Sequence, residues 1–253
     1  MLCSPVRGEE PAGGGWLLVL RDITAERERD RLREEMIRML MHDLQNPLGP
    51  IHLALEELAS YPDLSREARS LVHTALRGLG RLQNLISSLL DLARLESGRL
   101  PVEWEPVDIR GLIGEAMEEW GPMFQRRKLQ VYMEVAPELP WVWMDRQLIS
   151  RVLWNLLSNA AKFTPVGGEI RIRAYPQGGM AVLEVFNSGS YIPPEQRLRI
   201  FERFSTTPGY GGHGLGLAFS KLAVEAHGGF IEVESDRIGT TFVIRLPLHP
   251  PPS

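Results

Sequence analysis

Three polar side chains recur at helical spacing in the segment NLLSNAAKFT, residues 155–164. Asn155, Asn159 and Lys162 are separated by four and three residues, so in a helix they lie on one face. Amide oxygens suit Mg²⁺, and a lysine ammonium meets a phosphate group as a point charge. Taken alone, the row is more typical of the polar outer face of an ordinary helix, so a metal–phosphate site is a hypothesis that other segments must support.

A glycine-rich loop, TTPGYGGHGLGLAF, follows at residues 206–219 and holds five glycines between 209 and 216. Glycine lets backbone N–H groups approach phosphates, and a helix beginning near Gly214 presents the positive end of its dipole to them. Flexible loops without any ligand carry glycine clusters too. The loop therefore supports a phosphate site only together with other segments.

A third candidate is His42, in the segment MLMHDLQNPLGPI at residues 39–51. With Ile37 at position a of a heptad, apolar residues fall at a, d and e, and His42 falls at f, on the exposed side. Asn46 lies one turn further on that face, and Pro47 predicts a bend beside the histidine. A lone exposed histidine is usually only solvated, so its role depends on its neighbours.

Two long helices must position His42. They are expected at about 24–60 and 65–97, and the turn YPDLS joins them into an antiparallel hairpin with Ser65 as the cap of the second. Their apolar stripes are too wide for two helices to cover. The pattern therefore predicts a dimer that forms a four-helix bundle.

The rest of the chain has a different hydrophobic pattern, with shorter helices and strand-like segments. Helices are expected at about 108–127, 146–163, 194–202 and 214–227, and segments such as EIRIRAY and AVLEVFN alternate apolar and polar residues as strands do. This order predicts an α+β sandwich, a mixed sheet with helices on one face, beginning after a boundary near 98–106.

Composition excludes several classes of protein. The chain has 253 residues, a net charge of −4 and no basic stripe, which argues against nucleic-acid binding. Cys3 is the only cysteine, so an internal disulfide and a cysteine zinc site are excluded. Residues 1–15 read as a loop and WLLVLRDIT as a short strand, too short to span a bilayer. We expect no membrane segment, no signal peptide and a cytoplasmic chain.

Taken in order, these segments resemble those of bacterial sensor histidine kinases. HDLQNPL resembles the H-box, NLLSNAAKFT the N-box, FNSGSYIP the first glycine box, IFERF the F-box and GGHGLGLAFSK the second glycine box. GTTFVIRLP resembles the final glycine-box strand. One such match would be weak, but order and spacing agree over roughly residues 30–248.

The resemblance implies roles for the candidate residues. His42 would be phosphorylated by ATP, Asp43 would orient its ring, and Asn46 would position water for the reverse, dephosphorylating reaction. Asn159 would hold Mg²⁺. The implied nucleotide-binding residues are Asn155, Lys162, Phe163, Asn187, Gly189, Gly212, Gly214, Leu215 and Gly216.

The family pattern implies an organisation in four segments. Residues 1–23 resemble the final strand of a PAS sensor domain, and 24–36 a signalling coiled coil, for which a solvated helix is the alternative. Residues 37–98 would form the dimerisation and phosphotransfer domain and 104–249 the ATP-binding domain. The implied partners are a second copy of the chain and a response-regulator receiver domain, which receives the phosphoryl group on an aspartate.

One departure from the family pattern keeps an alternative open. Asn187 stands where the family has an aspartate that accepts a hydrogen bond from the adenine amino group, and Tyr191 replaces a glycine. An asparagine oxygen still accepts that bond but without charge, which would weaken ATP binding by about 1–2 kcal/mol. The alternative is a catalytically weak dimeric scaffold or phosphatase. Another ATPase with the same nucleotide fold is disfavoured by the helical hairpin around His42.

Overall fold

The computed structural model describes residues 2–6, 15–19, 39, 46–62, 64–96, 101–205 and 214–250. The chain divides into two compact units, residues 1–43 and 44–253. The predicted helix over 24–36, together with His42 and Asp43, lies outside the described residues.

The first unit contains a two-stranded antiparallel hairpin. Strand β1 (Leu2–Val6) pairs with β2 (Gly15–Val19), so the prediction of a loop over residues 1–15 is wrong for residues 2–6. Pro5 obscured this strand, because a proline cannot donate to a ladder and argues against a central strand. A proline is tolerated here because both strands of a two-stranded hairpin are edge strands.

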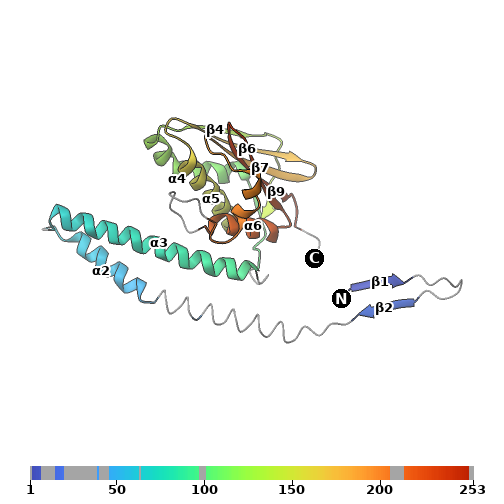
Figure 1. The fold of residues 1–253 in the computed structure, drawn as a ribbon, viewed down its shortest axis with the longest axis horizontal. Helices are drawn as coiled ribbons and strands as arrows, with labels where there is room; N and C mark the ends of the chain where they lie inside the picture. The colour runs from blue at the N-terminus through green and yellow to red at the C-terminus, as the bar shows by residue number, and fades with distance from the viewer. Residues whose placement is uncertain are drawn as a thin grey trace. The chain divides into compact units, whose positions relative to one another are not determined.

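The second unit begins with the predicted helical hairpin, formed by α2 (Leu48–Ser60) and α3 (Arg66–Glu96) (Figure 1). The prediction that Ser65 caps the second helix is confirmed, because its hydroxyl accepts the Ala68 N–H at 3.1 Å. Asn46 and Pro47 form a turn immediately before α2. The helix that was expected to bend at Pro47 is thus described only on its C-terminal side.

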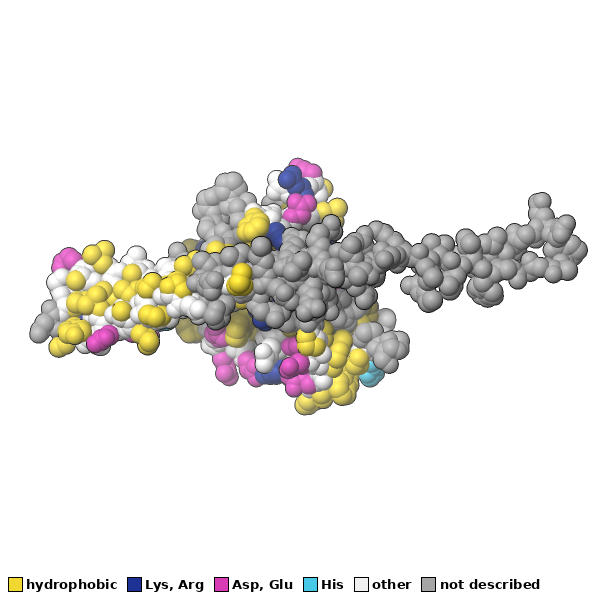
Figure 2. All heavy atoms as spheres, turned by 90° about the horizontal axis from the view of Figure 1, so that it is seen from below, with side chains coloured by type: hydrophobic (Ala, Val, Ile, Leu, Met, Phe, Trp, Pro, Cys, Tyr) yellow, Lys and Arg dark blue, Asp and Glu magenta, His cyan; other side chains and the backbone are white. Residues whose placement is uncertain are grey.

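The surface of this hairpin carries large apolar side chains (Figure 2). The exposed ones are Ile51, Leu53, Leu58, Leu71 and Leu82. Within the hairpin, the buried residues of α3 are seven positions apart, at Val72, Leu79 and Ile86. A helix pair that leaves this much apolar surface uncovered is typical of a bundle with further helices.

The α+β sandwich follows as predicted. Its five strands lie in the order β4 (Gln130–Val135), β6 (Glu169–Gln177), β7 (Met180–Ser188), β9 (Gly239–Pro247) and β8 (Phe230–Ser235). Only the β4–β6 pair is parallel, so the sheet is mixed. A separate short antiparallel pair is formed by β3 (Glu105–Val107) and β5 (Val142–Met144), which precede and follow β4 in the sequence.

Three helices cover one face of the sheet, which confirms the predicted layers (Figure 1). They are α4 (Ile109–Arg126), α5 (Arg146–Phe163) and α6 (Gly216–Ala226). The helix predicted over 194–202 is instead two 3₁₀ turns, η1 (Pro194–Gln196) and η2 (Arg199–Phe201). Both turns are closed by hydrogen bonds between residues three apart, from the Arg197 N–H to the Pro194 carbonyl and from the Glu202 N–H to the Arg199 carbonyl, which is the tighter 3₁₀ pattern and not that of a longer α-helix.

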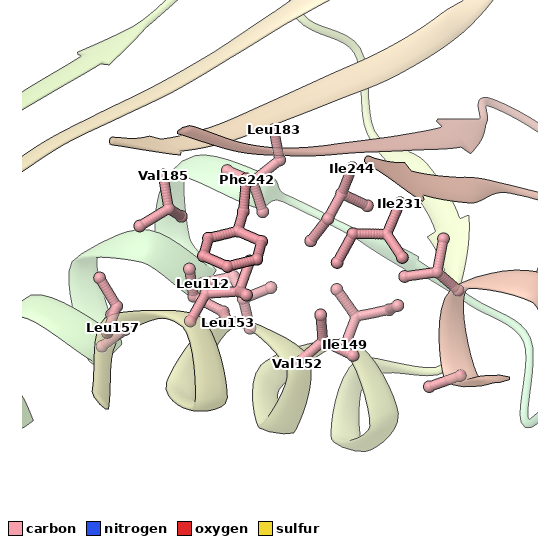
Figure 3. Close-up of a cluster of buried hydrophobic side chains, with 14 of the residues drawn as sticks. Leu112, Ile149, Val152, Leu153, Leu157, Leu183, Val185, Ile231, Phe242 and Ile244 are labelled. Carbon is pink, nitrogen blue, oxygen red and sulfur yellow. The ribbon is translucent and has the colours of Figure 1, made fainter. Parts of the chain in front are cut away.

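Apolar residues between helices and sheet form the core (Figure 3). Leu153 and Leu157 of α5 point toward Val185, Phe242 and Ile244 of the sheet, and all of them are 5% exposed or less. Their burial contributes roughly 1.5–3 kcal/mol each. The core therefore fixes which face of α5 is turned outward. No helix in the described part of the chain is long and apolar enough to cross a membrane.

The end of α3 joins this same core. Leu92 and Leu95 are buried in it, and Asp91 forms an ion pair with Arg151 of α5. Arg151 also donates to the Ser88 hydroxyl at 2.9 Å, and its guanidinium lies 4.0 Å from the centroid of the Phe219 ring in α6. The last turns of α3 thus pack on α5 and α6 through apolar, ionic and cation–π contacts.

His227, just after α6, is a buried histidine that ties three segments together. Its Nε2 accepts the Asp145 N–H at 2.9 Å, so Nδ1 carries the ring hydrogen and donates to the Ala223 carbonyl at 2.6 Å. The Asp145 carboxylate caps α5 and also accepts the Glu103 N–H at 3.1 Å. Burial lowers the pKa of His227 below its ordinary 6.5, against the opposing effects of the Ala223 carbonyl and Asp145.

This histidine predicts a pH dependence of stability. The folded chain resists protonation of His227 and the unfolded chain does not, so its contribution is full above the ordinary pKa and declines as the pH falls below about 6.5. Urea unfolding at about pH 7.5 and about pH 5.5 should show a smaller loss of unfolding free energy for His227→Gln than for the wild type. His249→Gln, at an exposed histidine, is the control and should keep the wild-type loss. Equal losses in all three chains would contradict the prediction.

Candidate nucleotide-binding site

The row predicted on residues 155–162 lies on α5, on the side turned away from the core. Asn155, Asn159 and Lys162 are half-buried, whereas the opposite side of the helix is fully buried. The residues predicted to form that buried side, Leu153, Leu156, Leu157 and Ala160, are 2% exposed or less. The helical arrangement of the row is therefore confirmed, and its chemical role stays a prediction.

Asn155 joins this row to the beginning of α6. Its Nδ2 donates to the Gly216 carbonyl at 3.2 Å. A Cβ on Gly216 would lie 3.4 Å from the Asn155 amide carbon, at ordinary van der Waals contact, so the Asn155 side chain packs directly against the start of α6. Helix α6 begins at Gly216, two residues later than predicted, with Leu215 in the N-cap position and no side-chain cap within the described chain. The first backbone N–H groups of a helix have no partner within the helix, and the helix dipole there favours an anion.

Gly214, two residues before α6, has a backbone conformation and a close contact that favour glycine. It has φ +65°, and a Cβ on it would lie 2.5 Å from the backbone carbon of Phe204. Only glycine meets both conditions. Gly214 therefore packs the end of the glycine-rich loop against the segment IFERF. Gly212, which the sequence also assigned to the site, lies outside the described residues.

Gly214→Ala should lower the free energy of unfolding by about 1–3 kcal/mol, because the new methyl group is strained by both φ and the Phe204 backbone. Gly114→Ala, inside α4 with nothing within 4 Å of the new Cβ, is the matched control and should stabilise by about 0.5–1 kcal/mol. Urea unfolding followed by circular dichroism measures both. A Gly214→Ala chain as stable as the wild type would show that this close contact is absent.

Lys162 lies at the end of the row, next to an aromatic side chain. Its Nζ is 4.8 Å from the centroid of the Phe163 ring. Desolvation lowers the pKa of Lys162, so the ammonium gains from any anion placed beside it. The pair offers a cation for a phosphate group and a ring for a flat base, on adjacent residues of one helix.

The first glycine box lies at the end of β7. Asn187 is 3% exposed and follows the apolar residues Ala181, Leu183 and Val185 on the inward face of the strand. Gly189 has φ +84°, and a Cβ there would lie 2.6 Å from Pro165. Tyr191 is 56% exposed. The box thus ends the apolar face of β7 with one buried amide.

Sequence reasoning missed two hydroxyl residues beside this amide. Asn187 Nδ2 donates to the Ser190 hydroxyl at 2.9 Å, and Ser190 donates to the Thr240 hydroxyl at 3.1 Å. Thr240 lies opposite Asn187 in the β7–β9 register. The sequence signal was two hydroxyl residues inside FNSGSYIP and GTTFVIRLP, which pairing of distant strands brings together.

The residues assigned to phosphoacceptor chemistry are described only in part. Asn46 lies in the exposed turn before α2, as its predicted exposed position requires. His42 and Asp43 lie outside the described residues.

Comparison with known proteins places both halves of the chain. Residues 32–98 match the His Kinase A (phospho-acceptor) domain, and residues 144–250 match the family of histidine kinase-, DNA gyrase B- and HSP90-like ATPases. The catalytic domain of the histidine kinase ThkA is 31% identical, with a TM-score of 0.56, and the match covers 58% of this chain and 97% of that domain. The chain belongs to the histidine kinase family.

Two longer relatives also match most of the chain. Full-length ShkA in complex with AMPPNP has a TM-score of 0.78 at 28% identity, over 87% of this chain and 47% of ShkA. The alginate biosynthesis sensor protein KinB of Pseudomonas aeruginosa is 35% identical over 92% of this chain and 40% of KinB. The chain thus spans about two fifths of the length of KinB.

Proposed function

We propose that this histidine kinase binds ATP in the sheet domain, transfers the γ-phosphoryl group to His42, and passes it to an aspartate of a response-regulator receiver domain. The observation that carries the proposal is the hydrogen bond from Asn155 to the Gly216 carbonyl. It sets the polar row of α5 beside the uncapped start of α6. The amides and the ammonium group of the row would then extend along α5 from the first backbone N–H groups of α6.

This donor set fits a triphosphate with Mg²⁺. Asn159 would hold Mg²⁺ through its amide oxygen, and Asn155 and Lys162 would contact phosphate oxygens. When bound, Mg²⁺ would neutralise part of the charge on the phosphate oxygens. Phe163 would lie against the adenine ring, and Asn187 would accept from its amino group. The remaining contacts would come from Gly189, Gly212, Gly214, Leu215 and Gly216.

The proposed reaction is an in-line phosphoryl transfer to a histidine. The neutral ring nitrogen of His42 attacks the γ-phosphorus, the bond to the β–γ bridging oxygen breaks, and ADP leaves. Asp43 accepts a hydrogen bond from the other ring nitrogen and stabilises the cation that develops. Lys162 neutralises negative charge on the phosphate. Catalysis is thus positioning and electrostatics, with one nucleophile.

The helical hairpin would supply the surfaces that bind the second copy of the chain and the receiver domain. Its exposed apolar side chains, such as Leu53 and Leu71, support a homodimer in which two hairpins form a four-helix bundle. The exposed Asn46 would position a water for dephosphorylation of the receiver domain, which would make the protein a phosphatase as well. We assign residues 37–98 to this dimerisation and phosphotransfer domain and residues 104–249 to the ATP-binding domain.

The segment before the hairpin would deliver the signal. Residues 1–23 would be the end of a PAS sensor domain, and the antiparallel β1–β2 pair is compatible with the final strands of a sheet. Residues 24–36 would continue as a coiled-coil helix into the hairpin. In this proposal the segment transmits a signal to the hairpin.

A catalytically weak scaffold or phosphatase is the second candidate. The observation that favours it is the buried neutral Asn187, which replaces a charged acceptor. Such a protein would keep the dimer and the receiver-domain surface and would bind ATP more weakly.

An autophosphorylation assay distinguishes the active kinase from the catalytically weak scaffold or phosphatase. The purified chain is incubated with γ-labelled ATP and Mg²⁺, and we expect a label that is lost in acid and retained in base, as a phosphohistidine is. The labelled chain should then lose its label to a receiver domain. An unlabelled chain at millimolar ATP would overturn kinase activity in favour of the scaffold.

A further inference from the structure

Asn187 differs from an aspartate in more than charge. A carboxylate presents two acceptor oxygens, whereas an amide has one acceptor oxygen and one donor NH₂ group. Which end faces a ligand is decided by the groups that hold the other end. At 3% exposure, Asn187 has little freedom outside its hydrogen bonds.

The hydrogen bonds around Asn187 run in one direction. Its Nδ2 donates to the Ser190 hydroxyl at 2.9 Å, Ser190 donates to the Thr240 hydroxyl at 3.1 Å, and Thr240 donates to the Ser190 carbonyl at 3.0 Å. Each hydroxyl has one hydrogen, so both are committed. The Ser235 hydroxyl lies 2.8 Å from that of Thr240 and 3.3 Å from the Gly239 carbonyl, so its single hydrogen is shared between these two acceptors.

This arrangement leaves Ser190 as an acceptor toward the amide. If the amide were reversed, its oxygen would face the Ser190 hydroxyl oxygen without a hydrogen between them. The two acceptors would repel, and the NH₂ group would lose its bond to the Ser190 hydroxyl and its longer bond, at 3.5 Å, to the Ser188 carbonyl. The hydroxyl pair, Ser190 and Thr240, thus holds the Asn187 amide with its NH₂ group toward the pair. The amide oxygen then faces away from the pair and is left for other contacts.

We infer that the Ser190–Thr240 hydroxyl pair turns the Asn187 oxygen toward the nucleotide base, which makes Ser190 a positioning residue for the choice of adenine over guanine. The inference rests on the proposed function, which places the base beside Asn187. Adenine carries an amino donor where guanine carries a carbonyl oxygen. An amide oxygen matches the first and repels the second, and a reversed amide would do the opposite.

The test compares ATP and GTP affinities by isothermal titration with non-hydrolysable analogues of both nucleotides. The wild type should prefer the ATP analogue. Ser190→Ala frees the amide to reverse and should reduce the preference about fivefold or more, the factor that one neutral hydrogen bond represents. Asn187→Asp in the Ser190→Ala background should restore it, because a carboxylate accepts in either orientation. A purely structural role of Ser190 would not give that rescue.

Two further variants sharpen the result. Ser188→Ala is the matched control: Ser188 is a neighbouring serine on β7 whose hydroxyl accepts the Glu169 N–H at 2.9 Å, and the ATP preference should be unchanged. Thr240→Val removes the acceptor of the Ser190 hydrogen and should shift the preference toward GTP, which keeps the test valid if Ser190→Ala fails to fold.

The outcomes separate the two proposals. A wild type that prefers ATP, with Ser190→Ala and Thr240→Val keeping the full preference, overturns the role of Ser190 and leaves the proposed function standing. A wild type that binds neither nucleotide overturns the adenine site and this inference together. A reduced preference rescued by Asn187→Asp supports the inference.

Discussion

His42→Ala should abolish the labelling of the chain by γ-labelled ATP, with a loss of at least about a thousandfold, because the variant lacks the nucleophile that forms the phosphorus–nitrogen bond. Binding of ATP should be unchanged, since the proposed nucleotide contacts come from other elements. The measurement is the initial rate of acid-labile labelling, with nucleotide affinity determined on the same sample.

His52→Ala is the matched control for this experiment. His52 lies ten residues later in α2, half-buried, with its Nε2 3.2 Å from the Glu56 carboxylate. We expect labelling close to that of the wild type. Label retained in His42→Ala, or lost only in His52→Ala, would move the phosphoacceptor away from His42.

Asn159→Ala should reduce the labelling rate at least about a hundredfold, because the proposed Mg²⁺ ligand is removed from the middle of the row on α5. The loss should shrink as the Mg²⁺ concentration is raised, because mass action offsets a weakened site. The measurement is the labelling rate over a Mg²⁺ titration. An unchanged Mg²⁺ dependence would show that Asn159 holds no metal.

Ser158→Ala is the matched control for Asn159. Ser158 precedes Asn159 on α5, is exposed, and lies about 100° around the helix from it. Its replacement leaves the row intact and should change neither the rate nor the Mg²⁺ dependence. A similar loss in both variants would indicate damage to α5 and would remove the support for a specific ligand.

The parts of the fold that follow from local periodicity were predictable. The buried side of α5 and the alternation of β6 and β7 could be assigned because each pattern records which face meets the core. Strand β1 could not, because Pro5 argues against a strand and its partner β2 is not adjacent to it in the sequence. The start of α6 was set two residues early because Gly214 serves a contact with Phe204 that no local pattern records.

The candidate site, too, was predictable from the sequence only in part. The row of Asn155, Asn159 and Lys162 lies on one helix, so spacing alone placed it. The Ser190–Thr240 pair depends on the register between β7 and β9, fifty residues apart, and that register becomes known only when the sheet is formed. The hydrogen-bond direction at Asn187 was therefore beyond the reach of its own sequence segment.

Helix α3 couples the two halves of the second unit mechanically. Its hairpin contacts lie on the line of Val72, Leu79 and Ile86, whereas Leu92 and Leu95 are not on that heptad line and face the sheet domain from another side of the helix. A rotation of α3 about its own axis therefore disturbs both contact surfaces at once. Any separation of the sheet domain from this 31-residue helix would therefore have to expose Leu92 and Leu95, which are buried in the core of that domain.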